Sequence, residues 1–386
     1  RAIPTTLSPG LAANFSAVTR RQLHAASRPD YLLIVPEALL PAVQPLVDLR
    51  AAQGLGVLVA PTEAIYDEFN GGRHSGAAIQ RFIRYAYENW DSRFVLLFGD
   101  GGIDPQRHSS RSGVDWVPTL PIPGPVGVGE GFEIVPGDPV YGCLTGNCNP
   151  QAFGPVLTEM MIGRLPVNSL ADANAVVAKL VAYENLAGDQ SWRRRLLLSS
   201  DDAFSGDSFF GGGGGGGGGY CHRDDEEHFV GLNTKCASIV NRDAGLALTN
   251  AELFNLRYYL ASEPWTYVPP ADTCRPDRAA TQGRTHAGVT PQLFAKLNAG
   301  VLWWNYQGHA NEYVLTHENL YVNSGDTPSG DDKYLFANPG RPLLFSAFSC
   351  HANMFARNDA GPGTPLGGCL GEDMVNAKSL DHQREI

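Results

Sequence analysis

Hydrophobic residues along this chain gather in short, nearly continuous runs. Strands that alternate apolar and polar residues are half-exposed, whereas continuous apolar runs are typical of strands buried on both faces of a parallel sheet. The clearest runs, each predicted to be a buried strand, are Tyr31–Val35, Phe94–Phe98, Leu196–Leu198 and Leu343–Phe348. Two weaker candidates for further strands are Val57–Ala60 and Val301–Tyr306.

Segments between these runs carry signals for the start and end of helices. Ser75 precedes apolar residues that are spaced for one face of a helix. Ser169 and Asp172 form a capping box before a second apolar stripe, and Gly188 is placed to end that helix. Strands that alternate with helices predict an α/β protein with a mainly parallel sheet.

Two further helices are predicted later in the chain. Thr249 and Glu252 repeat the capping box ahead of leucines with helical spacing. Thr290 is followed by Pro291, and Gly300 follows the last apolar residue of that segment. This order gives a cap, a first-turn proline and a terminal glycine, as expected for a helix.

Glycine and proline mark the segments that we predict to be loops. The stretches from Gly101 to Pro155 and from Pro264 to Thr290 lack hydrophobic periodicity and are interpreted as long surface loops. Gly211–Gly219 are nine consecutive glycines, which cannot hold one conformation in isolation. We interpret this run as an inert insert or as a stretch of unidentified side chains, rather than as a hinge or lid.

Length and composition exclude several classes of protein. With 386 residues the chain is long enough for two domains, which we place at residues 1–188 and 189–386. Hydrophobic residues make up 43% and charged residues 18% of the chain, so it can bury a core and is not disordered throughout. No apolar run reaches the roughly 18 residues that a membrane-spanning helix needs. The formal charge of −11 would repel phosphate, which argues against nucleic acid as a partner.

The seven cysteines are an odd number and leave the redox compartment open. In an extracellular protein six could pair and one would stay free, whereas in a cytosolic protein all seven could be reduced. Few lysines, many Asn, Gly and Thr residues and many proline-containing loops favour export. Cys143 and Cys148 lie close enough in sequence to form a small disulfide in an oxidising compartment. The chain begins at Arg1 without a leader, which we interpret as a processed form or a fragment.

Two apolar runs near the C-terminal end stop beside a reactive residue. Val301–Tyr306 leads into Gly308 and His309, and Leu343–Phe348 leads into Cys350. In an open parallel sheet, ligands bind at the carboxyl ends of the strands. If these two strands are neighbours, His309 and Cys350 face the same crevice. A thiolate next to an imidazole is the arrangement that a cysteine nucleophile requires.

The same chemistry needs backbone N–H groups that bind the oxygen of a tetrahedral intermediate. The N–H groups of Ala310 and Cys350 are the natural candidates for this oxyanion hole. The residue pattern alone also allows a plainer interpretation. A cysteine after an apolar run is commonly a small buried hydrophobic residue, and a histidine beside a glycine is commonly a loop residue.

Other reactive residues have plainer interpretations. The segment from Cys221 to His228 is rich in acidic residues, but its spacing does not match a structural zinc site, and we expect a solvated acidic face. Gly99–Gly102 is not a phosphate-binding loop, because no Gly-Lys-Ser/Thr follows it. His351 follows Cys350 directly, and we expect it to point away from the crevice.

The two strand ends resemble the signature of the gingipain-like cysteine peptidases, relatives of caspases and legumains. In that family one apolar strand ends at a His-Gly pair and another ends in a small residue followed by Cys. Further segments match the family's motifs in the family's order, namely FVLLFGDGGIDP (Phe94–Pro105), DPVYG (Asp138–Gly142) and EMMIGRLPV (Glu159–Val167). The resemblance extends from about Asp30 to Met374.

The resemblance implies a caspase-like, gingipain-type fold of open, mainly parallel sheets flanked by helices, in two lobes. It makes Cys350 the nucleophile and His309 the general acid and base. Glu159 occupies the family's acidic position before Ile-Gly-Arg and would orient the histidine, or it is an ordinary charged residue before a strand. Glu312 matches an acidic residue of the family and would form a wall of the substrate cleft, or lie in a solvated loop.

The function implied by the resemblance is that of a cysteine endopeptidase that forms an acyl-enzyme thioester. Two alternatives remain open. One is a sortase-like transpeptidase, and the other is a catalytically inactive relative that acts as a binding or structural component. Ala310 and Asn353 stand where the family has glycines, and this departure bears on activity rather than on the fold.

The resemblance also sets expectations about partners and location. It implies protein or peptide substrates, an extracellular or cell-surface location and further domains in a longer precursor. The chemistry requires no cofactor, although the family allows a structural calcium ion held by loop oxygens. The C-terminal end stops where a related domain would usually continue, so either the remainder is missing or this chain diverges there. If Cys350 is the free nucleophile, the other six cysteines could form up to three disulfides.

Overall fold

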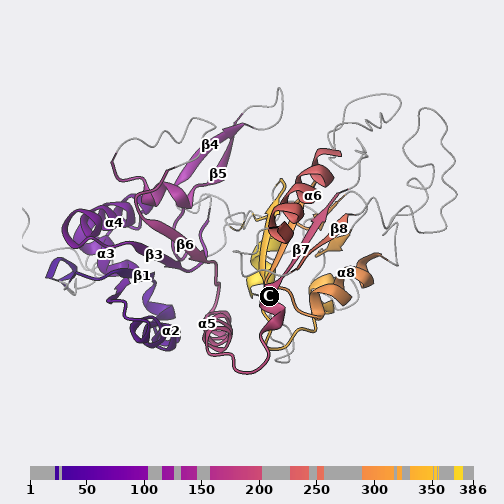
Figure 1. The fold of residues 1–386 in the computed structure, drawn as a ribbon. Coiled ribbons are helices and arrows are strands. Elements are labelled where there is room, and N and C mark those ends of the chain that lie inside the picture. Colours follow the sequence, from indigo (N-terminus) through magenta and orange to yellow (C-terminus); the bar gives the residue numbers. More distant parts are fainter. Residues whose placement is uncertain are drawn as a thin grey trace, which may run out of the picture. The chain divides into compact units, whose positions relative to one another are not determined.

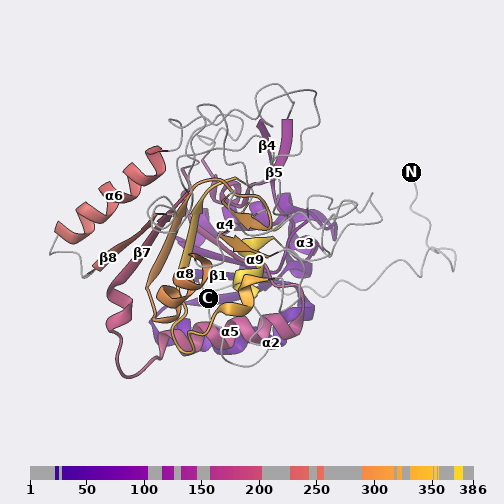
Figure 2. The same ribbon diagram turned by 90° about the vertical axis from the view of Figure 1, so that its right-hand side faces the viewer.

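The chain was analysed as a computed structural model, drawn in Figures 1 and 2. The structure describes residues 22–25, 28–102, 115–125, 132–145, 157–201, 227–242, 250–255, 289–316, 320–323, 331–350, 352–353, 355 and 369–376. The glycine run, residues 264–288 of the second predicted loop, His351 and three of the seven cysteines lie outside the described residues. These three cysteines are Cys148, Cys221 and Cys274.

The described residues form two compact units, one ending at Leu170 and the other beginning at Ala171. The boundary predicted at residue 188 falls after helix α5 (Leu170–Glu184), which from Ala171 onward belongs to the second unit. The ammonium of Lys179 donates a 2.7 Å hydrogen bond to the carbonyl of Val375 near the end of the described chain.

The first unit contains a parallel sheet with the strand order β2-β1-β3-β6. Its strands are β1 (Tyr31–Val35), β2 (Val57–Pro61), β3 (Phe94–Phe98) and β6 (Met161–Leu165). Its helices are α2 (Leu40–Ala52), α3 (Thr62–Asn70) and α4 (Gly76–Trp90), with short 3-10 turns at η1 (Leu23–Ala25) and η2 (Glu37–Leu39). Helices α3 and α4 cover one face of this sheet, and α2 lies on the other side (Figure 1).

Helix α4 shows how the sequence specifies this unit. It begins after Ser75, whose hydroxyl accepts a hydrogen bond from the backbone N–H of Ala77, as the capping pattern predicts. Phe82 and Ile83 on its apolar face are fully buried against Leu32 and Ile34 of β1 in one hydrophobic cluster. The prediction of a helix after Ser75 is therefore confirmed.

The region predicted as a long loop after Gly101 contains regular elements in its described part. Two short strands, β4 (Pro121–Pro125) and β5 (Phe132–Pro136), pair antiparallel, and a 3-10 turn, η3 (Asp138–Gly142), follows them. The loop prediction is wrong for these segments. Their proline and glycine content hid the strands, because prolines are tolerated in edge pairs such as this one.

The second unit contains another parallel sheet, with the strand order β12-β9-β7-β8. Its strands are β7 (Arg195–Ser200), β8 (Asn250–Asn255), β9 (Trp303–Gln307) and β12 (Leu344–Phe348). Its other elements are α6 (Glu227–Arg242), α8 (Val289–Asn298), α9 (Leu370–Asn376), the pair β10 (Val314–Leu315) and β11 (Tyr321–Val322), and the 3-10 turns η4 (Ser191–Arg194) and η5 (Asp332–Leu335).

Helices pack on both faces of the second sheet. On one face, Leu293 and Leu297 of α8 and Met374 of α9 are buried in the same cluster as Trp304 of β9. On the other face, residues of α6 such as Val240 pack against β7 and β8. The two sheets with their helices confirm the predicted α/β fold with mainly parallel sheets.

Two helix predictions in this unit have different outcomes. Residues 250–255 are strand β8 and not the helix predicted from Thr249 and Glu252. Ala251 and Leu253 pair in parallel register with Leu196 and Leu198 of β7, and this pairing overrides the local capping signal. The helix predicted at Thr290 is confirmed as α8, which begins one residue earlier.

Within the described residues, no helix is long and apolar enough to cross a membrane.

Candidate active site

Strands β9 and β12 are neighbours in the second sheet and run in parallel. Their register pairs Gln307 with Phe348, and the N–H of Gly308 donates a 3.3 Å hydrogen bond to the carbonyl of Phe348. His309 and Cys350 each follow two residues after these paired ends. The structure therefore places the predicted histidine and cysteine at the carboxyl end of adjacent strands, where ligands bind in open parallel sheets.

The two side chains differ in exposure. Cys350 is a free cysteine and is exposed, whereas His309 is half-buried. The ring of Phe229 in the first turn of α6 meets the ring of His309 edge to face, with 5.9 Å between the ring centroids and an interplanar angle of 89°. An accessible thiol and a partly enclosed imidazole fit the roles of nucleophile and acid–base group.

Asp201 anchors the backbone of His309. Its Oδ2 accepts a 3.0 Å hydrogen bond from the N–H of His309, and its own N–H donates to the carbonyl of Gln307 at 2.9 Å. The carbonyl of His309 accepts from the hydroxyl of Tyr306 at 2.6 Å and from the N–H of Thr316 at 2.9 Å. Asp201 is completely buried, so these hydrogen bonds are shielded from water.

The glycine before the histidine is required by this close approach. Gly308 has φ +153°, and a Cβ at this position would lie 2.5 Å from the Cβ of Asp201 and 2.6 Å from the hydroxyl oxygen of Tyr306. Either contact is shorter than a side chain can tolerate. Gly308 therefore lets the carboxylate of Asp201 reach the backbone of His309.

Ala310 keeps an N–H that suits an oxyanion hole. Among the described residues that are not glycine, positive φ occurs at Gln22, Asp91 and Thr316, so Ala310 and Asn353 are free of this strain. Ala310 forms an antiparallel bridge with Leu315, flanked by hydrogen bonds from Thr316 to His309 and from Asn311 to Val314. In such a pair the N–H of Ala310 points away from Leu315.

Glu312, after the histidine, and Ala352, after the cysteine, both form backbone hydrogen bonds with the start of α9. The N–H of Leu370 donates to the carbonyl of Glu312 at 2.7 Å, and the N–H of Gly371 donates to the carbonyl of Ala352 at 2.9 Å. Asn353 packs so closely on Gly371 that a Cβ there would lie 2.5 Å from its Oδ1. Glu312 thus has an anchored backbone, and its role in a substrate cleft stays a prediction.

Glu159, the third predicted catalytic residue, lies in the first unit. Its carboxylate accepts hydrogen bonds from the hydroxyl of Thr145 and from the N–H of Leu144, and these bonds lower the pKa of Glu159. Its bonds to these two residues belong to the first unit alone. A role of Glu159 toward His309 stays a prediction.

Sequence reasoning missed Asp201. This residue directly follows β7, the neighbour of β9, so it lies at the same carboxyl end of the sheet as His309. The rule that identified His309 and Cys350 would have identified Asp201 as well. We overlooked it because the predicted strand stopped at Leu198, before the two serines that complete β7.

The cysteines only partly follow the expectation. Cys143 is disulfide-bonded, whereas Cys236, Cys350 and Cys369 are free. Three disulfides among the other six cysteines are therefore excluded. Burial raises the pKa of the Cys369 thiol well above its usual range, so this residue stays protonated. Cys350 is the exposed thiol among the three free cysteines.

No group of three or more His, Cys, Asp or Glu residues that could hold a metal ion occurs in the described part of the chain. In the acidic segment from Cys221 to His228, only the last two residues belong to this part, at the start of α6. A structural calcium ion stays a prediction.

Peptidase family C25 matches this sequence over residues 24–379. The chain belongs to this family, the gingipain family. The structure is similar to that of gingipain R, described as an Arg-specific cysteine proteinase, with a TM-score of 0.58, 18% sequence identity and 94% of this chain covered. A complex of the pro- and mature domains of RgpB from Porphyromonas gingivalis gives a TM-score of 0.55 at 17% identity over 92% of this chain.

This C25 chain spans 61% of the length of each of the two gingipain chains. Dimeric latent PorU from Porphyromonas gingivalis is similar over 42% of this chain and 16% of its own length, at 27% identity and a TM-score of 0.37. A search of curated protein sequences finds no significant match. The family match shows the family of this chain, and the similar structures show its fold.

Proposed function

We propose that this chain is a cysteine endopeptidase in which Cys350 is the nucleophile and His309 is the general acid and base. The observation that carries the proposal is the parallel pairing of β9 with β12, in which Gln307 lies opposite Phe348. This register brings the histidine and an exposed free thiol to the same end of the sheet. All the groups that the chemistry needs belong to the chain.

In the proposed mechanism, His309 takes the proton of the Cys350 thiol, and the thiolate attacks the carbonyl carbon of a peptide bond. The N–H groups of Ala310 and Cys350 bind the oxyanion of the tetrahedral intermediate. The intermediate collapses when the C–N bond breaks and His309 gives its proton to the leaving amine. His309 then takes a proton from water, which attacks the thioester. The C–S bond breaks, the acid product leaves, and the Cys350 thiolate and protonated His309 are regenerated.

Asp201 supports His309 in this mechanism. Its buried carboxylate fixes the backbone of the histidine through the 3.0 Å hydrogen bond from the His309 N–H. The imidazole becomes positively charged in the course of the reaction, and a nearby negative charge in a water-poor site stabilises that form. We therefore assign to Asp201 the supporting part that the sequence had assigned to Glu159.

The proposed substrates are proteins or peptides outside the cell. Support for this location comes from Cys143, which is disulfide-bonded, because disulfides persist in oxidising compartments. The proposed location is the extracellular space or the cell surface.

The test is a cleavage assay on a mixture of peptides, followed by mass spectrometry. We expect cleavage by the wild-type protein and a loss of at least about a thousandfold in Cys350→Ala and in His309→Ala. Cys369→Ala is the matched control, because it removes a buried free thiol, and it should retain cleavage. Equal cleavage by Cys350→Ala would overturn the proposal. An added amine that captures most of the acyl group would identify a transpeptidase instead.

A further inference from the structure

The hydrogen bonds around His309 hold its backbone, but a reacting imidazole must also keep its ring in one orientation. The ring turns about two side-chain torsions that backbone bonds do not fix. One contact that bears on the ring is the edge-to-face packing of Phe229, at 5.9 Å between centroids. The Phe229 ring also packs on His228, at 4.1 Å between centroids.

Helix α6 presents Phe229 and Asn233 one turn apart, and residues at this spacing share one face of a helix. On β9 and its extension, Asn305 and His309 are likewise four residues apart. Phe229 contacts His309, and the side-chain N–H of Asn305 donates to Oδ1 of Asn233 at 3.4 Å. Two successive contacts therefore join α6 to the segment that carries the histidine.

The two asparagines belong to a buried polar network. The Nδ2 of Asn233 donates to the carbonyl of Ser199 in β7 at 2.8 Å, and Oδ1 of Asn305 accepts from the hydroxyl of Ser346 in β12 at 2.8 Å. Asn233 is completely buried and Asn305 is 3% exposed. The network thus connects α6 with β7, with β9 and with β12, the strand that leads to Cys350.

Around this network the interface between α6 and the sheet is apolar, with Leu196, Leu198 and Val240 in one cluster. Apolar contacts have no direction, so they permit a helix to slide, whereas a buried amide that loses its partners is costly. The paired asparagines therefore fix the position of α6 along the sheet.

We propose that Phe229 is a positioning residue that holds the ring of His309 in its reactive orientation, and that the Asn233–Asn305 pair places Phe229. This inference rests on the proposed function. His309 has to face the thiol, then the leaving amine and then water, so a ring that turns freely lowers the rate of each transfer. A positioning role acts on the proton transfers, so the proposal predicts an effect on kcat rather than on KM.

The test compares Phe229→Leu with Phe229→Tyr. Phe229→Leu keeps apolar volume but removes the aromatic ring, and we expect kcat to fall roughly 3- to 10-fold with KM within about twofold. Phe229→Tyr keeps the ring and should restore kcat to within about twofold of the wild type. Leu232→Ala is the matched control on α6, because Leu232 is 51% exposed, and it should change neither constant.

A second readout does not depend on activity. In NMR spectra of protein with labelled histidines, His309→Ala identifies the His309 ring resonances by their absence. Phe229→Leu should move these resonances, because it removes the ring current of Phe229, and Asn233→Leu should move them in the same direction. Leu232→Ala should leave them in place.

The two readouts fail separately. Unmoved His309 resonances in Phe229→Leu would overturn the positioning role, whatever the activity. Moved resonances together with an unchanged kcat would also overturn it. A wild-type protein that cleaves no peptide, but whose His309 resonances move in Phe229→Leu, would overturn the proposed function and leave the ring contact supported.

Discussion

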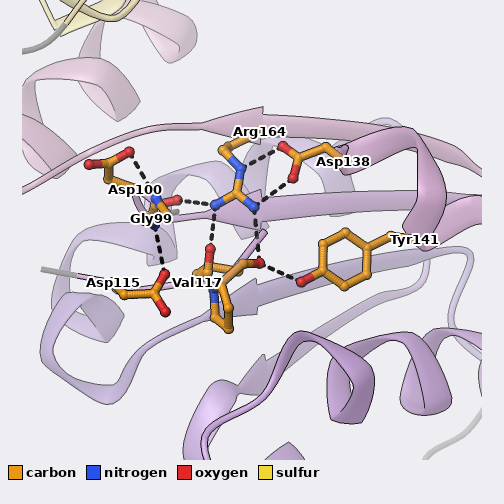
Figure 3. A network of polar contacts seen from close by, with 10 residues as sticks. Gly99, Asp100, Asp115, Val117, Asp138, Tyr141 and Arg164 are labelled. Atoms are coloured by element: carbon orange, nitrogen blue, oxygen red, sulfur yellow. Dashed lines mark hydrogen bonds and ion pairs between the residues drawn. The ribbon is translucent and has the colours of Figure 1, made fainter. Parts of the chain in front are cut away.

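The carboxyl ends of the two sheets differ in how their polar residues are exposed. In the first unit these residues are buried and hydrogen-bonded to one another, and in the second unit a thiol is exposed. In the first unit, Arg164 of β6 is buried, and its guanidinium binds both oxygens of Asp138 at 2.6 and 2.8 Å (Figure 3). It also donates to the carbonyls of Gly99 and Val117, both at 2.7 Å, and to that of Pro118 at 3.4 Å. These five hydrogen bonds use every N–H of the guanidinium.

In the second unit, the corresponding end of the sheet presents an exposed thiol at Cys350 and a half-buried imidazole at His309. The buried carboxyl group of Asp201 accepts a hydrogen bond from the backbone N–H of His309 and leaves the thiol exposed. The same four-stranded parallel topology thus supports a closed polar network in one unit and an open reactive end in the other. In this chain the arginine of the Ile-Gly-Arg motif has a structural role, and the proposed chemistry lies at the two strand ends of the second unit.

The electrostatics of Arg164 explain why its end of the sheet is closed. Burial disfavours the charged guanidinium and would lower its pKa, but the charge and the hydrogen bonds of Asp138 outweigh burial and raise it. Arg164 therefore stays positively charged at any ordinary pH. The hydroxyl of Tyr141 donates to the Pro118 carbonyl and completes the network (Figure 3).

The largest change in stability is expected when a substitution breaks the closed network around Arg164. Arg164→Leu leaves Asp138 without the cation that it faces, and we expect the free energy of unfolding to fall by about 3–5 kcal/mol. Chemical denaturation measures this change. Arg93→Leu is the matched control, because the side chain of Arg93 is 69% exposed and its 3.7 Å pair with Asp91 is on the surface, so it should change stability by less than about 0.5 kcal/mol. Equal effects of the two substitutions would contradict the structural role of Arg164.

The next effect concerns the open end. Asp201→Asn preserves the shape and an acceptor for the N–H of His309 but removes the buried charge. We expect kcat to fall roughly tenfold, because the imidazolium form of His309 is no longer stabilised by a nearby carboxylate. Steady-state kinetics checks this. A neutral result at Asp201 combined with a loss in Glu159→Gln would return the supporting role to Glu159.

A pH titration should reveal the buried acids of the second unit. Burial raises the pKa of Cys369 and of Tyr321 in the folded state. Above about pH 8.5 the unfolded chain releases the thiol proton while the folded chain retains it, so stability is full below this pH and falls as the pH rises. We expect Cys369→Ala to flatten this decline in denaturation experiments between about pH 8 and 10. An unchanged slope would show that Cys369 is not shielded.

The smallest expected effect is at the position where the family has glycine after the histidine. Ala310 does not have positive φ, so Ala310→Gly relieves no strain. We expect kcat to stay within about twofold and stability to fall by about 0.5–1 kcal/mol, because glycine gains more freedom in the unfolded chain. A large gain in kcat would show that the alanine impairs the oxyanion hole.

The sequence predicted the parts of the fold that local pattern controls. The apolar runs located β1, β3, β9 and β12 to within two residues, and the rule about carboxyl ends of strands placed His309 and Cys350 together. Strand β8 was misread as a helix, because a capping signal is local and strand pairing is not. The sequence pattern did not predict helix α6, because its buried face includes the polar residue Asn233. The partner of Asn233 is Asn305, more than 70 positions away in the sequence.

The most direct test of the central claim is the rate at which a thiol reagent modifies each free cysteine of the native protein. With iodoacetamide at about pH 6, and with peptide mapping by mass spectrometry, Cys350 should react first, because an imidazole favours its thiolate. His309→Ala should slow this reaction about tenfold or more while Cys236 and Cys369 react as before. If Cys350 reacts at the same rate with and without His309, the two residues do not form a catalytic pair and the account is wrong.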